Sequence, residues 1–344
     1  MRGEQRIKTL IISLISFILI ITVFEILFRV SGKEPWTLIF IGSPKAFQAD
    51  PIIGWKNKPG TYYFPEHTPG KEQAIMTIDK EGYRIASPQP RKGDKTVIYT
   101  GGSDIMGWAV SDNEVFTWKI SERFKDLRIV NMASAGYSTY QSLLNLRDYF
   151  NNHEEKPDLV ISAFDFFQIE RNVAAPQFFN GLARFNGENR LGLPYCTLSL
   201  KPGKDLEYFP PAIHPNWPLK KYLALINEAE FLYVRIKYKE AYSQQYEVTE
   251  LLLKELANLC KLNDVPFLIS IMIIPEPFWD LKVPDNIGEK YMRFMETNQI
   301  DYVDCCVDYF KTGDIIPGDL HPNEKVHERW AECVGNAIEE RLYQ

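Results

Sequence analysis

The sequence predicts an α/β protein whose parallel β-sheet is covered by helices on both faces and is preceded by one transmembrane helix. Short β-branched runs alternate with helical segments of about ten to fifteen residues, a rhythm typical of βαβ units. An apolar run at residues 9–28 has the roughly 20 residues that a helix needs to cross a bilayer. The 344 residues are 45% hydrophobic, enough for one large core or two modest cores.

The residues around the apolar run predict a signal anchor with a cytoplasmic N-terminus and an extracytoplasmic, periplasmic main domain. Three basic residues and one acidic residue precede the run: Arg2, Arg6, Lys8 and Glu4. Glu25 is the single charge inside it, and Arg29 follows on the same helical face, so this pair can lie at the membrane interface. A cleaved signal peptide, with a cleavage site at residues 30–32, is the alternative, although its apolar region is usually only about 7–15 residues long.

The composition divides the chain into three parts. Residues 1–32 form the anchor, and residues 33–95, rich in Pro, Gly and charge, form a leader that packs on the main domain. Residues 96–344 form that domain. It carries a cap-like, aromatic-rich insertion at 168–246 in which one long helix, 219–238, is expected.

The main domain shows the alternating pattern from which the fold class is predicted. Five expected strands cover residues 95–100, 127–132, 157–164, 266–274 and 300–305. Four expected helices cover residues 114–124, 140–150, 247–262 and 326–342.

Charge and cysteine content exclude several classes of protein. The net charge of −6 and the lack of basic runs interleaved with aromatics argue against nucleic acid as a partner. Five irregularly spaced cysteines indicate neither a disulfide scaffold nor a zinc site, and we interpret most of them as small buried hydrophobic residues.

Ser103 follows the first expected strand after two glycines, in the stretch VIYTGGSDIMG. Ligands of parallel α/β sheets bind beyond the carboxyl ends of the strands, where this serine is expected. The glycines allow a sharp turn that exposes the hydroxyl, an arrangement that suits a nucleophile. A serine before a helix is also a common N-cap, so partners are needed to decide.

His321 is the partner that the sequence offers. It lies in the polar stretch GDLHPNEKVH, just before the last helix and beyond the last strand, so it is expected at the same sheet edge as Ser103. Asp319 precedes it by two residues and can orient the imidazole and stabilise its protonated form. The alternative is a surface loop in which Asp319 and Asn323 only make turns.

These residues resemble the SGNH or GDSL-type hydrolase superfamily, in its bacterial branch with an N-terminal membrane helix. TGGSDIMGWAVSDNEVF is similar to the first block of the family, NMASAGYSTYQ to the second and GDLHPNEKVH to the last. The resemblance implies a flavodoxin-like α/β/α sandwich of three layers, serine esterase or acyl-transfer chemistry, and no metal or organic cofactor. It assigns the nucleophile to Ser103, an oxyanion amide to Gly136, and the rest of the triad to Asp319 and His321.

Two positions depart from the pattern of this family. Gly102 stands where the Asp of Gly-Asp-Ser is expected, and the stretch ISAFDFFQIERN lacks the asparagine of the third block. Gln168 is the candidate to supply the missing amide, since an ionised Asp165 can only accept hydrogen bonds.

The leading hypothesis is a membrane-anchored SGNH-type serine esterase or O-acyltransferase that acts on an acylated polysaccharide or lipid, with polysaccharide-assembly proteins as possible partners. The alternative is a catalytically degenerate member that keeps the fold to bind a polysaccharide or a partner protein. A third hypothesis, a structural anchor protein, predicts no cleft at the sheet edge.

Overall fold

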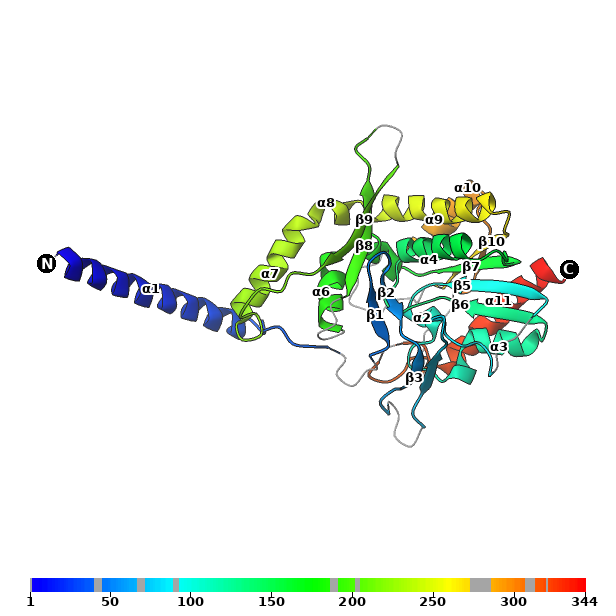
Figure 1. The fold of residues 1–344 in the computed structure, drawn as a ribbon, viewed down its shortest axis with the longest axis horizontal. Coiled ribbons are helices and arrows are strands. Elements are labelled where there is room, and N and C mark those ends of the chain that lie inside the picture. Colours follow the sequence, from blue (N-terminus) through cyan, green and yellow to red (C-terminus); the bar gives the residue numbers. More distant parts are fainter. Residues whose placement is uncertain are drawn as a thin grey trace.

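The computed structural model describes residues 2–39, 45–66, 72–88, 93–185, 191–201, 205–272, 286–306, 313–319 and 321–344. It is built around one five-stranded sheet with helices on both sides (Figure 1). The N-terminal helix extends away from this body (Figure 1). The fold class predicted from the sequence is confirmed.

The strands of this sheet are β5 (Lys95–Thr100), β6 (Leu127–Asn131), β7 (Leu159–Phe164), β10 (Phe267–Ile271) and β11 (Tyr302–Asp304). Their order across the sheet is β11-β10-β7-β5-β6, and every neighbouring pair is parallel. Numbered along the chain, this is the 2-1-3-4-5 order of flavodoxin-like folds, whose ligand crevice opens between the first and third strands, here β5 and β7.

Alternate side chains of the strands supply the two halves of the core. On one face, Ile98 and Val160 pack with residues of α4 (Thr139–Asn152) and α9 (Gln245–Leu262). On the other face, the ring of Tyr99 meets Phe116 of α3 (Phe116–Arg123) at 5.0 Å between centroids. The last helix, α11 (Glu324–Leu342), packs against α3.

All six residues of β7 are buried, as expected for a strand covered on both faces. A further helix, α10 (Ile287–Thr297), packs on the end of β7 through Tyr291 and Phe164.

The leader forms two hairpins on the main domain. Strands β1 (Phe47–Asp50) and β2 (Gly54–Asn57) make the first, and β3 (Gly60–Tyr63) and β4 (Ile75–Ile78) make the second. Trp55 of β2 is fully buried, so the leader contributes to the core and to the loops beside it.

The insertion contains more structure than the single helix expected from the sequence. It holds α5 (Phe167–Arg171), α6 (Pro176–Phe185), the hairpin of β8 (Gly192–Leu198) and β9 (Leu206–Ile213), α7 (Ala224–Lys237) and α8 (Lys239–Ser243). The expected long helix is α7, which begins only at Ala224 because Leu219 has a positive φ of 67° and Leu223 is still extended, at φ −121° and ψ 119°. The hairpin was not expected because three prolines interrupt its strands.

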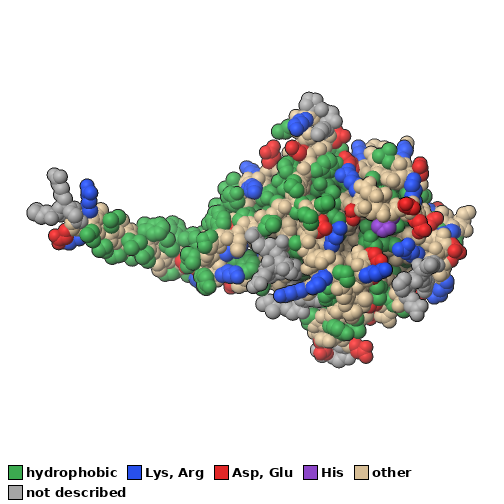
Figure 2. All heavy atoms as spheres, viewed as in Figure 1, with side chains coloured by type: hydrophobic (Ala, Val, Ile, Leu, Met, Phe, Trp, Pro, Cys, Tyr) green, Lys and Arg blue, Asp and Glu red, His purple; other side chains and the backbone are tan. Residues whose placement is uncertain are grey.

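The N-terminal helix α1 (Arg2–Val30) projects from the body, with hydrophobic side chains along its surface (Figure 2). Among the described residues it is the one helix long and apolar enough to cross a membrane, a property that signal sequences share. Its last turns pack against α7. Arg29 Nε donates to Glu25 at 2.6 Å, which confirms the expected pairing of the charge inside the apolar run.

Candidate active site

A cavity of about 230 Å³ lies at the carboxyl edge of the sheet, where the loops after β5, β6 and β7 meet. Ser103, Gly136 and His321 all line it, so three of the predicted site residues come together there. The remaining walls are mostly apolar: Ile39, Trp108, Ala135, Phe167, Phe178, Gly181, Leu182 and Phe185, with Asp104 and Arg171 as the other polar members. Such a chamber suits an acyl group beside a few polar atoms.

Ser103 is the first residue of the short helix α2 (Ser103–Met106). Gly102 occupies the N-cap position, so Ser103 is not the cap that the alternative interpretation required. Gly101 has φ +158°, and a Cβ atom there would lie 2.6 Å from Cγ1 of Ile105. Only glycine therefore fits the close turn that carries the chain from β5 to the serine.

The leader supports the loop that contains Gly136. The indole Nε1 of Trp55 donates to the carbonyl of Ala135 at 3.1 Å, and the hydroxyl of Tyr137 donates to the carbonyl of Trp55 at 2.6 Å. Gly136 itself has φ +80°, which disfavours any residue with a side chain. The loop is therefore held in one conformation from both sides of Gly136.

The side chains of His321 and Asp319 interact directly, with Nδ1 of the imidazole 2.5 Å from Oδ1 of the carboxylate. The loop is closed by a hydrogen bond from the Ile316 N–H to the His321 carbonyl at 2.8 Å. The contact of Nδ1 with Asp319 leaves Nε2 as the imidazole nitrogen available to exchange a proton.

The pKa of His321 lies above its ordinary value. Burial disfavours the imidazolium, but the hydrogen bond and charge of Asp319, together with the charge of Asp104, outweigh burial. Arg171 acts in the opposite direction. The imidazole thus has the environment of a base whose protonated form is stabilised.

Two further acids are buried beside the cavity. Burial raises the pKa of Asp104, while the charges of His321 and Arg171 lower it. Burial likewise raises the pKa of Asp165 to about 6, although Arg171 opposes the shift. Both carboxylates therefore interact electrostatically with the same guanidinium group.

Gln168 does not line the cavity. Its Nε2 donates to the carbonyl of Ala163 at 3.0 Å, and its Oε1 accepts from the hydroxyl of Thr139 at 2.9 Å. The amide is used inside the fold, in contrast to the oxyanion role expected for it. Arg171, three residues later, lines the cavity instead and was not predicted as a site residue. The sequence marks it only as the first basic residue after β7, which does not show whether its side chain turns inward.

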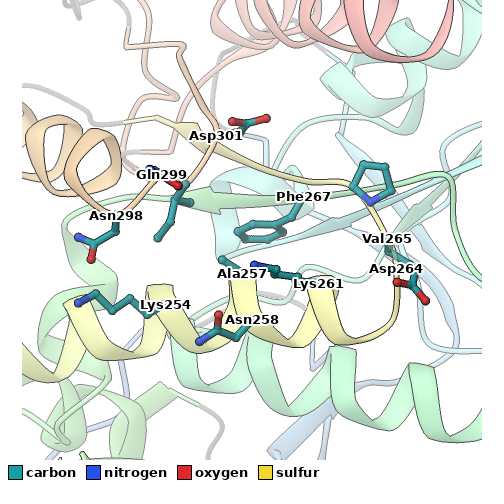
Figure 3. A pocket seen from close by; sticks show the side chains of 12 residues that line it. Lys254, Ala257, Asn258, Lys261, Asp264, Val265, Phe267, Asn298, Gln299 and Asp301 are labelled. Carbon is teal, nitrogen blue, oxygen red and sulfur yellow. The ribbon is translucent and has the colours of Figure 1, made fainter.

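The described part of the chain holds no group of three His, Cys, Asp or Glu side chains arranged to bind a metal ion. A larger hollow of about 720 Å³ lies near the start of β10 and the turn before β11, between Lys254 and Asp301 (Figure 3). It borders the amino ends of these strands, the edge opposite to the one where ligands of such sheets bind.

No protein-family model matches the chain, and no curated protein matches it. Among solved structures, the chain is similar to a member of the lipolytic protein G-D-S-L family from Veillonella parvula, with 12% identity over 72% of this chain and 98% of that one and a TM-score of 0.40. It is similar to the psychrotrophic esterase EstA from Pseudoalteromonas sp., with 13% identity, 72% and 100% coverage and a TM-score of 0.39. A third is Axe2, an acetylxylan esterase from Geobacillus stearothermophilus, with 12% identity, 74% and 98% coverage and a TM-score of 0.38.

Proposed function

We propose that this protein is a membrane-anchored serine esterase or O-acyltransferase that acts on acylated glycans or lipids outside the cytoplasm. The observation that carries the proposal is the common cavity of Ser103, Gly136 and His321, with Asp319 bonded to the far nitrogen of the imidazole. A nucleophile, a base and an orienting acid in that order form the constellation of serine acyl transfer.

In the proposed reaction, the Ser103 hydroxyl attacks the acyl carbonyl while His321 takes its proton. The carbonyl π electrons move to oxygen, and the N–H groups of Ser103 and Gly136 stabilise this oxyanion. Collapse of the intermediate expels the alcohol, which receives the proton from His321, and leaves an acyl-serine. Water or a sugar hydroxyl then repeats the sequence with His321 as base, which gives hydrolysis or transfer.

The contact between α1 and α7 supports an anchor that is retained. Glu25 accepts hydrogen bonds from the backbone N–H groups of Ala224 and Leu225, at 3.0 and 2.9 Å. Cleavage at residues 30–32 would remove this acceptor and leave the first amides of α7 without it. We therefore propose that α1 is kept in the mature protein.

The surface beside α1 also supports a body that rests against the bilayer. Hydrophobic side chains continue from α1 onto the adjoining end of the body (Figure 2). The exposed apolar residues of this region are Trp217, Leu219, Tyr222, Leu232, Tyr233 and Ile236. Aromatic residues in such a position are typical of the membrane interface.

The linker between α1 and the cavity is short, which supports a substrate close to the membrane. Ile39 lines the cavity, and its N–H donates to the carbonyl of Arg184 in α6 at 3.0 Å. Ile39 lies nine positions after Val30, the last residue of α1, so the cavity wall lies within about 32 Å of the end of α1.

A disulfide between Cys305 and Cys333 supports the extracytoplasmic location. Disulfides persist in oxidising compartments and are rare in the cytosol. This pairing is not predicted from the sequence, because a separation of 28 residues with irregular spacing carries no recognisable pattern.

A degenerate, substrate-binding member of the same fold is the second candidate function. The observation in its favour is the inward engagement of Gln168, which leaves the expected amide donor out of the cavity. Loss of one oxyanion donor typically lowers the rate of the reaction by about 10²–10³. A degenerate member would keep the cavity for binding and turn over its ligand too slowly to act as an enzyme.

A fluorophosphonate probe on the full-length protein in detergent tests the proposal. We expect labelling of the parent, no labelling of Ser103→Ala, and parental labelling of Ser243→Ala, which removes an exposed serine from α8. Turnover of p-nitrophenyl acetate should follow the same pattern. Equal labelling of the Ser103→Ala variant and the parent, or no labelling of either, rejects the esterase and favours the binding protein.

A further inference from the structure

Arg171 presents its guanidinium group to the cavity from the last residue of α5. It lines the same cavity as Ser103, Gly136 and His321. Its Nη1 donates to the carbonyl of Tyr137 at 3.2 Å, the residue that follows Gly136. The positive charge therefore lies on the Gly136 side of the nucleophile, where the oxyanion is expected.

Two aromatic rings hold the guanidinium in place. Its central carbon lies 5.3 Å from the ring centroid of Phe167 and 5.0 Å from that of Phe178. The Nε atom is shielded from solvent and has no hydrogen-bond acceptor among the described residues. A buried donor without an acceptor is costly, so the two rings and the charges of Asp104 and Asp165 are what keep the guanidinium in this position.

Gly102 brings this group next to the nucleophile. A Cβ atom on Gly102 would lie 3.2 Å from Nη1 of Arg171 and 3.6 Å from Oδ2 of Asp165. The φ of Gly102 is −87°, which any residue can adopt, so the close approach of Arg171 is the reason for glycine here. The space beside Ser103 that a side chain at position 102 would fill is occupied by the guanidinium.

We propose that Arg171 is a third oxyanion donor of the active site. As Ser103 forms its bond to the acyl carbon, the electrons displaced onto the carbonyl oxygen are stabilised by N–H groups of Arg171 together with the backbone N–H groups of Ser103 and Gly136. The two departures of the sequence, at Gly102 and at the missing asparagine, then have one cause. This inference rests on the proposed esterase or transferase activity.

A charged donor is well matched to this role. Hydrogen bonds from guanidinium to an anionic oxygen are about twice as strong as those between neutral groups. The neutral carbonyl of the bound ester is a weaker acceptor than the oxyanion, so Arg171 favours the transition state over the ground state. Its removal should therefore lower kcat more than it raises KM.

The test compares Arg171→Gln and Arg171→Ala with the parent on p-nitrophenyl acetate, with full-length protein in detergent. We expect kcat to fall by about 10²–10³ with KM within about threefold. Added guanidinium chloride should restore part of the rate of Arg171→Ala and none of the rate of Ser103→Ala.

The acid limb of kcat/KM should move to higher pH in Arg171→Gln, because the charge that lowers the pKa of His321 is gone. Arg293→Gln, which removes an exposed arginine of α10 that pairs with Glu289, is the matched control and should retain the parental rate.

Gly102→Ala is an independent variant that leaves Arg171 in the chain. The new methyl group would press on Nη1 of Arg171 and shift the guanidinium by a few tenths of an ångström, and we expect a fall in kcat of about tenfold, whereas Gly313→Ala, which meets open space, should retain the parental rate. An active parent with an unchanged kcat in Arg171→Gln overturns the role of Arg171 alone. So does a rate loss in Arg171→Ala that guanidinium does not relieve. A parent without Ser103-dependent turnover instead overturns the proposed function.

Discussion

The carboxylate of Glu25 in α1 accepts a hydrogen bond from the backbone N–H of Ala224, 3.0 Å away at the start of α7. The N-cap residue of α7, Leu223, has no side-chain acceptor of its own. A residue about 200 positions earlier in the chain therefore caps this helix. This contact joins the N-terminal helix α1 to the body of the protein at the start of α7.

Replacing Glu25 with alanine should loosen the start of α7. Loss of a capping oxygen typically destabilises a helix by about 1 kcal/mol, and here it exposes two amides at once. Hydrogen exchange of the full-length protein in detergent should show faster exchange at residues 224–227. Glu4→Ala removes an exposed carboxylate from the same helix and should leave these amides unchanged. Equal protection in both variants would show that the contact does not stabilise α7.

Replacing Asp319 with asparagine should disable His321 as a base. The amide cannot stabilise the imidazolium, and we expect kcat to fall by about 10³–10⁴. In the parent, kcat/KM should rise with a midpoint above pH 6.5, because the base must be neutral and its pKa is raised. In Asp319→Asn the residual activity should have a lower midpoint, since the charge that raises this pKa is lost.

Asp314→Asn is the control for this variant, because it removes a carboxylate of the same loop that pairs with Arg329 at 2.7 Å. It should keep the parental midpoint. A parental rate in Asp319→Asn would exclude the carboxylate from the mechanism.

The local sequence predicted those parts of the molecule whose signals lie in neighbouring residues. Strand β5 is predicted to the residue, because a β-branched run ends there in two glycines. Ser103 and His321 were expected at one sheet edge because the carboxyl ends of parallel strands share that edge. The partners of Gln168 and the placement of Arg171 could not be derived, since they depend on which face of α5 turns inward after β7. Likewise, the capping of α7 by Glu25 joins segments that carry no common pattern.

The Cys305–Cys333 disulfide should stabilise the C-terminal part of the fold, because it links the residue after β11 to α11. The two cysteines are 28 residues apart in the sequence. For a loop of this length, we expect removal of the disulfide to lower the free energy of unfolding by about 2–4 kcal/mol. The double variant Cys305→Ser/Cys333→Ser should unfold at lower urea concentration than the parent. Cys306→Ser changes the neighbouring cysteine outside the disulfide and should unfold like the parent. A reductant that leaves the unfolding of the parent unchanged would contradict the expected contribution.

His327 should make the fold sensitive to acid. It is buried in α11, where its Nδ1 accepts from the N–H of Phe116 at 3.4 Å and its ring stacks on that of Phe116. Burial and, to a smaller extent, the charges of Arg84 and Lys119 together lower the pKa of His327 to about 3. The unfolded chain binds this proton near pH 6.5, so the contribution of His327 is complete above that pH and is lost as the pH falls.

Between pH 8 and pH 5 this linkage should lower the free energy of unfolding by about 2 kcal/mol. Urea unfolding at a series of pH values measures the slope, and in His327→Gln the slope should flatten by that amount even though the variant is less stable at pH 8. His153→Gln, which changes an exposed histidine at the end of α4, should keep the parental slope. If the slope of His327→Gln equals that of the parent, the acid sensitivity comes from other groups, and the buried imidazole is not its source.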